Sequence, residues 1–288
     1  MNGTNSKTLI LAANAGAYCY PWGNNEHIMI TAPEHALCAP GLLDWFGKVI
    51  LINGLGEHWL FHPALWEKET YYFLWDPARC PRYAPDCEAL ERIKQAHKVY
   101  SFQREDCEAL GLRFNSTFYA PPPPGLYADA EEKRYDVLFL GVPKDRMPLL
   151  RALHHDLSVL GLRLKFQIGL TAAECCPEEA PGWKVTWEWA AYPDYLRWVL
   201  QSRCLLDVYQ SIQTGFSLRV MEHIFFGKKL ITNNQTLGQA EFYHPDNIFI
   251  LGRDDMENLK AWLDLPFVPI EEEIKRYYHI ESWVKRFT

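Results

Sequence analysis

The chain has 288 residues, of which 48% are hydrophobic and 23% are charged, and it carries a net charge of −7. This composition indicates a globular protein with room for one large domain or two of ordinary size. An acidic chain lacks the basic face of a nucleic-acid-binding protein, and its apolar stretches fall short of the roughly 18 residues of a membrane span. We therefore expect no nucleic-acid partner and no transmembrane segment. The first seven residues also lack the pattern of a secretory signal, so we expect a cytoplasmic protein.

The first part of the chain contains apolar runs of the length of a β-strand. Such runs are typical of the buried strands of a parallel sheet. They occupy residues 8–12, 27–31, 48–52, 71–75 and 98–102. Helical patterns are predicted over residues 86–96 and 103–110, and the second ends near Gly111. We therefore expect an α/β domain over residues 1–122.

A proline-rich stretch separates this region from the next. Four consecutive prolines follow Ala120, and a charged stretch at residues 128–134 comes after Gly125. Consecutive prolines form a stiff, extended spacer, and domain boundaries fall in such segments. We predict a linker over residues 123–134.

The remainder of the chain begins with a strand–helix–strand pattern at residues 135–140, 147–160 and 162–168, which implies parallel pairing. Further elements are predicted downstream: strands at 184–187, 204–209, 229–233 and 246–251, and helices at 193–202 and 255–263. The fold class is therefore α/β with two Rossmann-like domains. The second domain would span residues 135–268, and a largely helical segment over 269–288 closes the chain.

The segment from Gln213 to Glu222 is the most informative in the chain. A turn at Gly215 opens a helix capped by Ser217, and a helix N-terminus presents free N–H groups and a positive dipole end that suit a phosphate. Arg219 and Glu222 are three residues apart and share one helix face. The cation can meet a diphosphate, and the carboxylate can accept hydrogen bonds from ribose hydroxyls. The alternative to a ligand site is that Ser217 only caps the helix and that Arg219 and Glu222 form an ion pair with a purely structural role.

The residues from Thr214 to Asn234 resemble the donor-site segment of GT-B glycosyltransferases. Together with residues 99–115 and 281–287, the segment 213–219 is similar to bacterial glycosyltransferase-like proteins of lipopolysaccharide and surface-polysaccharide loci. The resemblance implies two domains facing a cleft and a C-terminal helix that crosses back to the first domain. It also implies metal-independent transfer of a sugar from a nucleotide-diphospho-sugar to a glycan or lipid-linked saccharide.

The resemblance also implies a set of donor-binding residues. These are Gly141, Lys144, Arg146, Tyr192, Gln213, Thr214, Gly215, Phe216, Ser217, Leu218, Arg219 and Glu222. The nucleobase of the donor would contact the aromatic region formed by Trp187, Trp189, Tyr192 and Tyr195. The family pattern has two Glu separated by seven residues; Glu222 matches the second and Thr214 occupies the first, which leaves the donor sugar and the stereochemistry open. For Lys144 and Arg146, a solvated surface turn is the alternative.

Candidates for a catalytic base follow two strands of the first domain, because an acceptor hydroxyl needs a proton acceptor. They are Glu57, His58 and Asp76, each of which has a structural role as its alternative. The preceding Asn53-Gly-Leu-Gly lacks the third glycine of a dinucleotide fingerprint, so we predict a turn there without a helix. No Asp-x-Asp motif occurs and the eight cysteines show no metal-ligand spacing, so we expect no metal and no cofactor besides the nucleotide sugar.

The sequence is also compatible with two functions other than transfer. The Thr at position 214 also fits a non-catalytic protein of the same fold that binds nucleotides or acts as a scaffold. A nucleotide-sugar epimerase is the second alternative. The end of the chain carries Trp283, Val284 and Phe287 beside two cations, so peripheral contact with the inner face of a membrane is an alternative to packing on the first domain.

Overall fold

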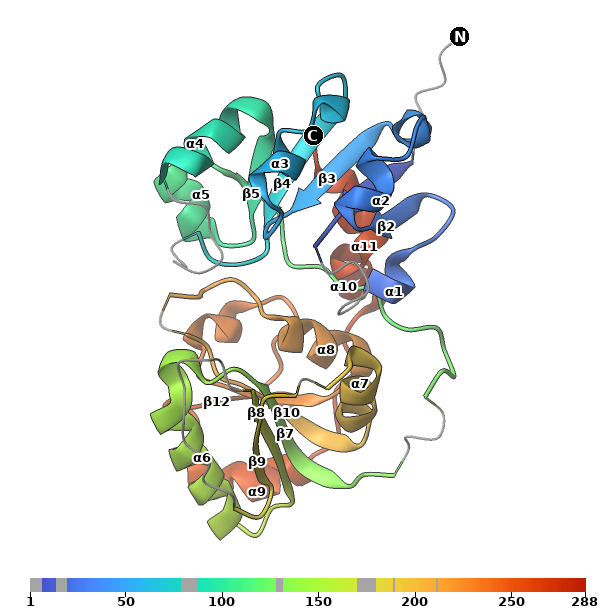
Figure 1. Ribbon diagram of the computed structural model, residues 1–288. Helices are drawn as coiled ribbons and strands as arrows, with labels where there is room; N and C mark the ends of the chain where they lie inside the picture. Colours follow the sequence, from blue (N-terminus) through green and yellow to red (C-terminus); the bar gives the residue numbers. More distant parts are fainter. Residues whose placement is uncertain are drawn as a thin grey trace. The chain divides into compact units, whose positions relative to one another are not determined.

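The computed structural model describes residues 7–13, 20–78, 87–127, 132–169, 180–188, 190–210 and 212–288. The chain forms two compact units (Figure 1). Unit 1 comprises Met1–Pro122, Ile212–Phe216 and Arg276–Thr288, and unit 2 comprises Pro123–Ser211 and Ser217–Lys275. The return of the C-terminal segment to the first unit confirms that part of the fold prediction. The inclusion of Ile212–Phe216 in unit 1 was not predicted.

Unit 1 is built on a parallel sheet with the strand order β2-β1-β3-β4-β5-β6. Five of its strands lie where the apolar runs predict them, and the two-residue β6 was not predicted. The strands are β1 (Thr8–Leu11), β2 (Ile28–Thr31), β3 (Lys48–Ile52), β4 (Glu69–Leu74), β5 (Lys98–Ser101) and β6 (Arg113–Phe114). The direction in which successive strands are added reverses between β1 and β3.

Short helices connect these strands. They are α1 (Tyr20–Gly23), α2 (Pro33–Leu37), α3 (Glu57–Leu60), α4 (Cys87–Ala96) and α5 (Arg104–Leu110), with 3-10 turns η1 (Leu42–Trp45) and η2 (Pro63–Leu65). Helices α2 to α5 pack on one face of the sheet, whereas Gly23 of α1 lies against Ile30 and Ile280 on the other face. Alternate residues of the strands, such as Leu9 and Leu51, pack with Leu90 and Ile93 of α4 in one core. The prediction that no helix opens after Asn53 is wrong, because α3 begins directly after Gly56; its single turn is too short to show a helical period.

The end of the chain covers the other face of the unit 1 sheet. It is helical as predicted but divided into α10 (Glu272–Tyr278), α11 (Ile280–Trp283) and η7 (Val284–Arg286). Trp283 is fully buried with its ring 4.0 Å from that of Phe118, and Phe287 packs against Tyr71 and Tyr100. The apolar face that was considered for a membrane is therefore inside the unit. Among the helices that the structure describes, none is long and apolar enough to cross a bilayer.

Unit 2 contains a second parallel sheet with the order β12-β11-β10-β7-β8-β9. Its strands are β7 (Tyr135–Gly141), β8 (Leu164–Gly169), β9 (Trp183–Thr186), β10 (Ser202–Asp207), β11 (Lys229–Thr232) and β12 (Ile248–Ile250). The α/β class with two parallel sheets is thus confirmed. The order of addition reverses between β7 and β10, which are hydrogen-bonded neighbours.

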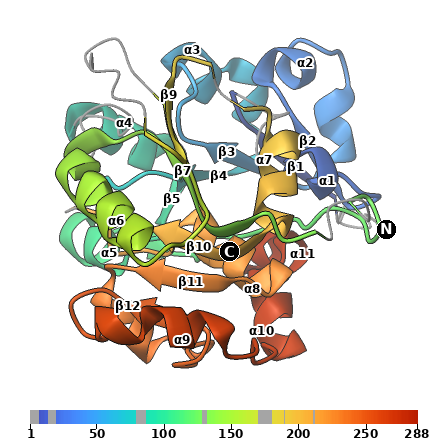
Figure 2. The same cartoon turned by 90° about the horizontal axis from the view of Figure 1, so that it is seen from below.

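Helices cover both faces of this sheet (Figures 1 and 2). They are α6 (Met147–Val159), α7 (Tyr192–Leu200), α8 (Leu218–Phe226) and α9 (Leu259–Asp264), with 3-10 turns η4 (Lys144–Arg146), η5 (Gln235–Gln239) and η6 (Met256–Asn258). Leu153 of α6 and Leu263 of α9 share one core with Phe139 and Leu206 of the strands. The other face carries α7 and α8, which contact β10.

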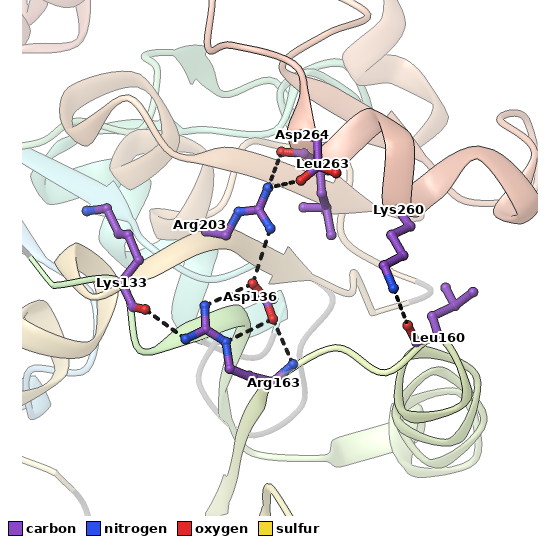
Figure 3. A network of polar contacts seen from close by, with 8 residues as sticks. All are labelled: Lys133, Asp136, Leu160, Arg163, Arg203, Lys260, Leu263 and Asp264. Atoms are coloured by element: carbon purple, nitrogen blue, oxygen red, sulfur yellow. Dashed lines mark hydrogen bonds and ion pairs between the residues drawn. The ribbon is translucent and has the colours of Figure 1, made fainter.

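A polar network closes the amino-terminal edge of this sheet (Figure 3). Asp136, at the start of β7, accepts hydrogen bonds from the backbone and the guanidinium of Arg163 and from Arg203. Arg203 also donates to Asp264 at the end of α9, with an N–O distance of 2.6 Å. Burial by itself raises the pKa of Asp136, but the bonds from the two arginines outweigh it, and the pKa is lowered. The network ties β7, β8, β10 and α9 together at the edge opposite to the strands' carboxyl ends.

Candidate functional site

The carboxyl ends of β7 and β10 form the most distinctive place in unit 2. These neighbouring strands flank the point where the order of strand addition reverses. In open α/β sheets, ligands bind outside the carboxyl ends of the strands at such a point. Gly141 ends β7 and Asp207 ends β10. The turn after β7 and the helix α8 supply the side chains around this edge.

Ser217 fixes the N-terminus of α8 at this edge. Its hydroxyl donates to Asp207 and accepts from the backbone N–H of Val220 at 3.3 Å, so it is the predicted N-cap. Its own backbone N–H donates to the hydroxyl of Tyr209 at 3.1 Å. The N–H groups of Leu218 and Arg219, in the first turn, have no hydrogen-bond partner among the described residues. Two donors at the positive end of the helix dipole therefore remain for an anion.

Arg219 places a cation beside this helix end. Its guanidinium lies over the ring of Phe139 at 5.3 Å, and its Nη2 is 3.5 Å from the position that a Cβ on Gly141 would take. The guanidinium therefore lies next to the backbone at the end of β7. Burial lowers the pKa of Arg219, but Tyr195 and the buried carboxyls Asp207 and Glu222 more than offset this, and the pKa is raised. Arg219 is therefore a permanent cation.

Arg146 brings a second guanidinium to the same edge. It donates to three backbone carbonyls, those of Val142, Pro143 and Val208, and so holds the turn after β7 against the end of β10. Burial and the nearby charge of Arg219 lower the pKa of Arg146 to about 10. Both guanidinium groups lie near the ring of Phe139, Arg146 at 6.0 Å and Arg219 at 5.3 Å, so a bound anion would relieve the repulsion between them. Lys144 lies in the same turn, half-buried and with a positive φ of 49°.

Asp207 belongs to this site although the sequence analysis did not single it out. It is 3% exposed, and burial raises its pKa against the opposing effects of Arg219, Ser217 and Arg146. Its carboxyl group orients the N-cap and partly balances the two arginines. In the sequence, Asp207 stands out as a single acid at the end of an otherwise apolar strand, a pattern that indicates a polar group at the edge of a sheet.

Glu222 lies one turn further along α8 and is fully buried. Its two carboxyl oxygens accept from the hydroxyl groups of Tyr195, at 2.5 Å, and Tyr192, at 3.2 Å. These bonds join α8 to α7. Burial raises the pKa of Glu222 to about 7, against the opposing effects of Arg219 and the two tyrosines. The ribose contact stays a prediction, and a ribose hydroxyl would compete with these tyrosines for the carboxylate.

The first half of the predicted donor segment belongs to unit 1. The backbone N–H groups of Thr214 and Gly215 donate to the side-chain oxygen of Gln103 at 2.7 and 3.4 Å. The Thr214 hydroxyl donates to Glu105, and the carbonyl of Phe216 accepts from Thr117 at 2.6 Å. Gln213 donates to the carbonyl of Gly215. The structure thus divides the predicted donor residues between the units at the bond after Phe216.

The remaining aromatic candidates differ in their surroundings. Trp187, just after β9, is 57% exposed, whereas the hydroxyls of Tyr192 and Tyr195 are engaged by Glu222. Trp189 lies outside the described residues. A base-stacking role therefore stays a prediction, for which Trp187 offers the most exposed ring of the three described.

The candidates for the catalytic base lie near the carboxyl ends of β3 and β4 in unit 1. Glu57 forms an exposed ion pair with Arg92 at 3.2 Å, and the ring of His58 lies 4.6 Å from that of Trp59 with the two planes tilted by 45°. Asp76 accepts at 3.1 Å from the amide of Asn53, whose oxygen accepts from the backbone of Trp75. Asp76 is therefore the candidate whose carboxylate is held in place by the sheet edge. Within the described ranges, no cluster of three or more His, Cys, Asp or Glu could hold a metal ion.

Comparisons with known proteins are sparse for this chain. No protein-family model matches it, and no curated protein does. A solved structure with a related fold is an alpha-glucosyltransferase in complex with UDP and a 13-mer DNA containing a central A:G mismatch. The two share 10% sequence identity, and the match covers 96% of this chain and 82% of that chain with a TM-score of 0.49. A similarity at this level assigns neither a family nor a function.

Proposed function

We propose that unit 2 binds a nucleotide-diphospho-sugar and that the protein transfers the sugar to a saccharide acceptor. The observation that carries this proposal is the convergence of two guanidinium groups and of two N–H groups that lack a partner among the described residues at the strand-order reversal of unit 2. Arginines bind phosphate oxygens through paired hydrogen bonds, and a helix N-terminus adds donors that need no protonation change. The arrangement suits a diphosphate better than a neutral or cationic ligand.

The proposed chemistry is electrostatic. During transfer the bond between the sugar's anomeric carbon and the diphosphate breaks, and negative charge grows on the leaving phosphate. Arg219 and the first turn of α8 would stabilise that charge, because their dipoles and charge are fixed before the reaction. They would supply the positive charge that other enzymes take from a divalent cation. Asp76 would take the proton of the attacking hydroxyl if the reaction inverts the anomeric centre.

The finer parts of the proposal follow the family resemblance of the sequence. The acceptor would bind unit 1 and the nucleotide sugar unit 2. The acceptor would be a glycan or a lipid-linked saccharide in cell-surface polysaccharide synthesis at the cytoplasmic face of a membrane. Glu222 would accept hydrogen bonds from the ribose hydroxyls, in competition with the hydroxyls of Tyr192 and Tyr195.

Product analysis tests the proposal directly. The purified protein would be incubated with UDP-, GDP-, dTDP-, ADP- and CMP-sugars, with and without a mixture of oligosaccharides, and the released nucleotide measured by chromatography. We expect acceptor-dependent release from one donor, reduced about a hundredfold or more by Arg219→Gln, which removes the charge at the leaving group. Arg253→Gln is the matched control, because this arginine pairs with Asp254 after β12 and should leave the rate unchanged.

The alternatives give different products. Conversion of a nucleotide sugar to its isomer without an acceptor would indicate an epimerase. Binding without any turnover would indicate a scaffold. Full transferase activity in Arg219→Gln would refute the assignment of this arginine to the leaving group.

A further inference from the structure

Unit 1 contains a hollow that the proposed transfer chemistry does not use. Its volume is about 570 Å³, within the range of small-molecule sites. Leu37 and Leu43, each 7% exposed, contribute an apolar floor. These two leucines bring part of the unit's core to the hollow, whereas Asp44, Trp66 and Glu67 line it with exposed side chains.

The position of the hollow separates it from the candidate bases. Its lining comes from residues 37–44, which lead from the end of α2 into η1 and on to β3, and from residues 63–68, which lead from η2 to β4. Both segments lead into the amino-terminal ends of their strands, whereas Asn53 and Asp76 follow the carboxyl ends of the same two strands. The hollow lies at the opposite edge of the sheet and is a separate site.

The side chains at its rim combine a flat ring with hydrogen-bonding groups. Trp66 lines the hollow and is 78% exposed, which leaves most of a large apolar ring in water. Asp44 and Lys68 form an ion pair at 3.5 Å in which the Asp44 side chain is 80% exposed, and Glu67 adds a second carboxylate. The carboxylates accept hydrogen bonds and the ammonium donates them.

We infer that this hollow is a saccharide-binding site. A sugar ring has one face of C–H groups, which packs on the electron-rich face of an indole, and a perimeter of hydroxyls that both donate and accept. The rim of Asp44, Glu67 and Lys68 matches that perimeter without requiring a net charge on the ligand.

Other ligand classes fit this rim less well. Two carboxylates against one ammonium repel nucleic acid and anionic lipid headgroups. An apolar protein anchor would have to strip water from the Asp44–Lys68 pair, which costs more than such a pair returns. A neutral saccharide replaces that water with its own hydroxyls.

This inference stands apart from the proposed transfer reaction. The arginine site belongs to unit 2 and the hollow belongs to unit 1, so each can fail while the other holds. A protein that transfers sugar but binds no saccharide at the hollow would refute only the inference made here.

Cys38 provides a reporter, because it is exposed and lines the hollow. The full-length protein would be alkylated with iodoacetamide in the presence of maltohexaose, cellohexaose, chitohexaose or mannohexaose, and the rate at Cys38 followed by peptide mass spectrometry. We expect at least one hexasaccharide to slow alkylation of Cys38 in a saturable way. Trp66→Ala should weaken that protection about tenfold or more, because the stacking face is lost.

Trp45→Ala is the matched control. Trp45 is 63% exposed but does not line the hollow, so its removal should leave the protection within about twofold of the wild type. Calorimetric titration with the same hexasaccharide should show similar affinities for the wild type and Trp45→Ala and a weaker affinity for Trp66→Ala. Absence of protection by all four probes up to about 10 mM, or equal protection in Trp66→Ala and the wild type, would overturn the inference.

Discussion

At the scale of single residues, the electrostatics of unit 2 depend on a few buried groups around Arg219. Asp207 and Glu222 are carboxyls whose pKa values are raised by burial, and Arg146 is an arginine whose pKa is lowered. Displaced pKa values of this kind gather at functional sites, because function needs charge where folding alone would exclude it. Of these charged groups, Arg219 lies in the first turn of α8 and its guanidinium lies beside the end of β7.

Glu222 gives a prediction about the pH dependence of stability. Its pKa rises from 4.5 in an ordinary environment to about 7 in the folded protein, so between these values the folded state holds a proton that the unfolded state has lost. The stabilising proton is present below pH 4.5 and is lost as the pH rises through 7. Relative to the wild type, Glu222→Gln should therefore gain about 3 kcal/mol of unfolding free energy between pH 4.5 and 7.

Urea unfolding at several pH values measures this difference. Comparing variant with wild type cancels the contributions of other titrating groups, such as the buried His223. Tyr195→Phe is the second variant. The hydroxyl of Tyr195 lowers the pKa of Glu222, so its removal should shift the pH range over which the Glu222 contribution is lost to higher pH. A difference that stays constant with pH would show that Glu222 has an ordinary pKa.

At the scale of elements, the strands were easier to predict from the sequence than the short helices or the contacts between residues distant in sequence. Runs such as residues 48–52 are apolar on both faces, because both faces of a parallel sheet are covered, and this alone locates them. Helices α2 and α3 span one turn or little more, so no helical period exists to be detected. The Ser217 cap and the Arg219 position follow from local spacing. Asp207 and the bonds of Gln103 to Thr214 depend on residues distant in sequence, which a single sequence does not pair.

The amino-terminal edge of the unit 2 sheet gives the prediction at this scale. Asp136 is almost buried and receives hydrogen bonds from two arginines, so Asp136→Asn should cost about 2–3 kcal/mol, reduced from a fully buried pair because Arg163 is half exposed. Since the pKa of Asp136 is lowered, its contribution is fully present above the ordinary value of 3.8 and is lost as the pH falls from there through the lower pKa of the folded state.

Urea unfolding at pH 7 and pH 3 would measure both effects. Asp264→Asn is the control, because Asp264 contacts the same Arg203 but is 69% exposed, and its loss should cost less than about 1 kcal/mol. Equal costs for the two variants at pH 7 would contradict the role given to Asp136.

At the scale of the whole molecule, the chain passes between the units at four places, and one of them is next to the candidate site. The bond between Phe216 and Ser217 leads from a segment fixed in unit 1 to the N-cap of α8 in unit 2. Gly215 is needed in that segment, because a Cβ there would lie 2.4 Å from the Phe102 ring and 2.6 Å from its carbonyl oxygen. The helix end that we propose to bind phosphate is therefore covalently tied to a segment that has no room for a side chain at position 215.

Gly215→Ala should displace this segment and cost about 1–3 kcal/mol through overpacking. Hydrogen exchange of the peptide covering residues 212–216 should become faster, because the bonds to Gln103 are lost. Gly141→Ala is the stability control, since its Cβ would meet its nearest atoms at 3.5 Å, an ordinary contact. Unchanged exchange in Gly215→Ala would mean that the segment is not held as described.

The central claim is that the arginines and the α8 N-terminus bind a diphosphate, and calorimetric titration tests it most directly. UDP, GDP, dTDP and ADP would each be compared with the nucleoside that lacks phosphate, on the wild type and on Arg219→Gln. We predict that one diphosphate binds about a hundredfold or more tightly than its nucleoside, and that Arg219→Gln removes most of this difference. A nucleoside that binds as tightly as its diphosphate, or a diphosphate affinity unchanged in Arg219→Gln, would contradict the account.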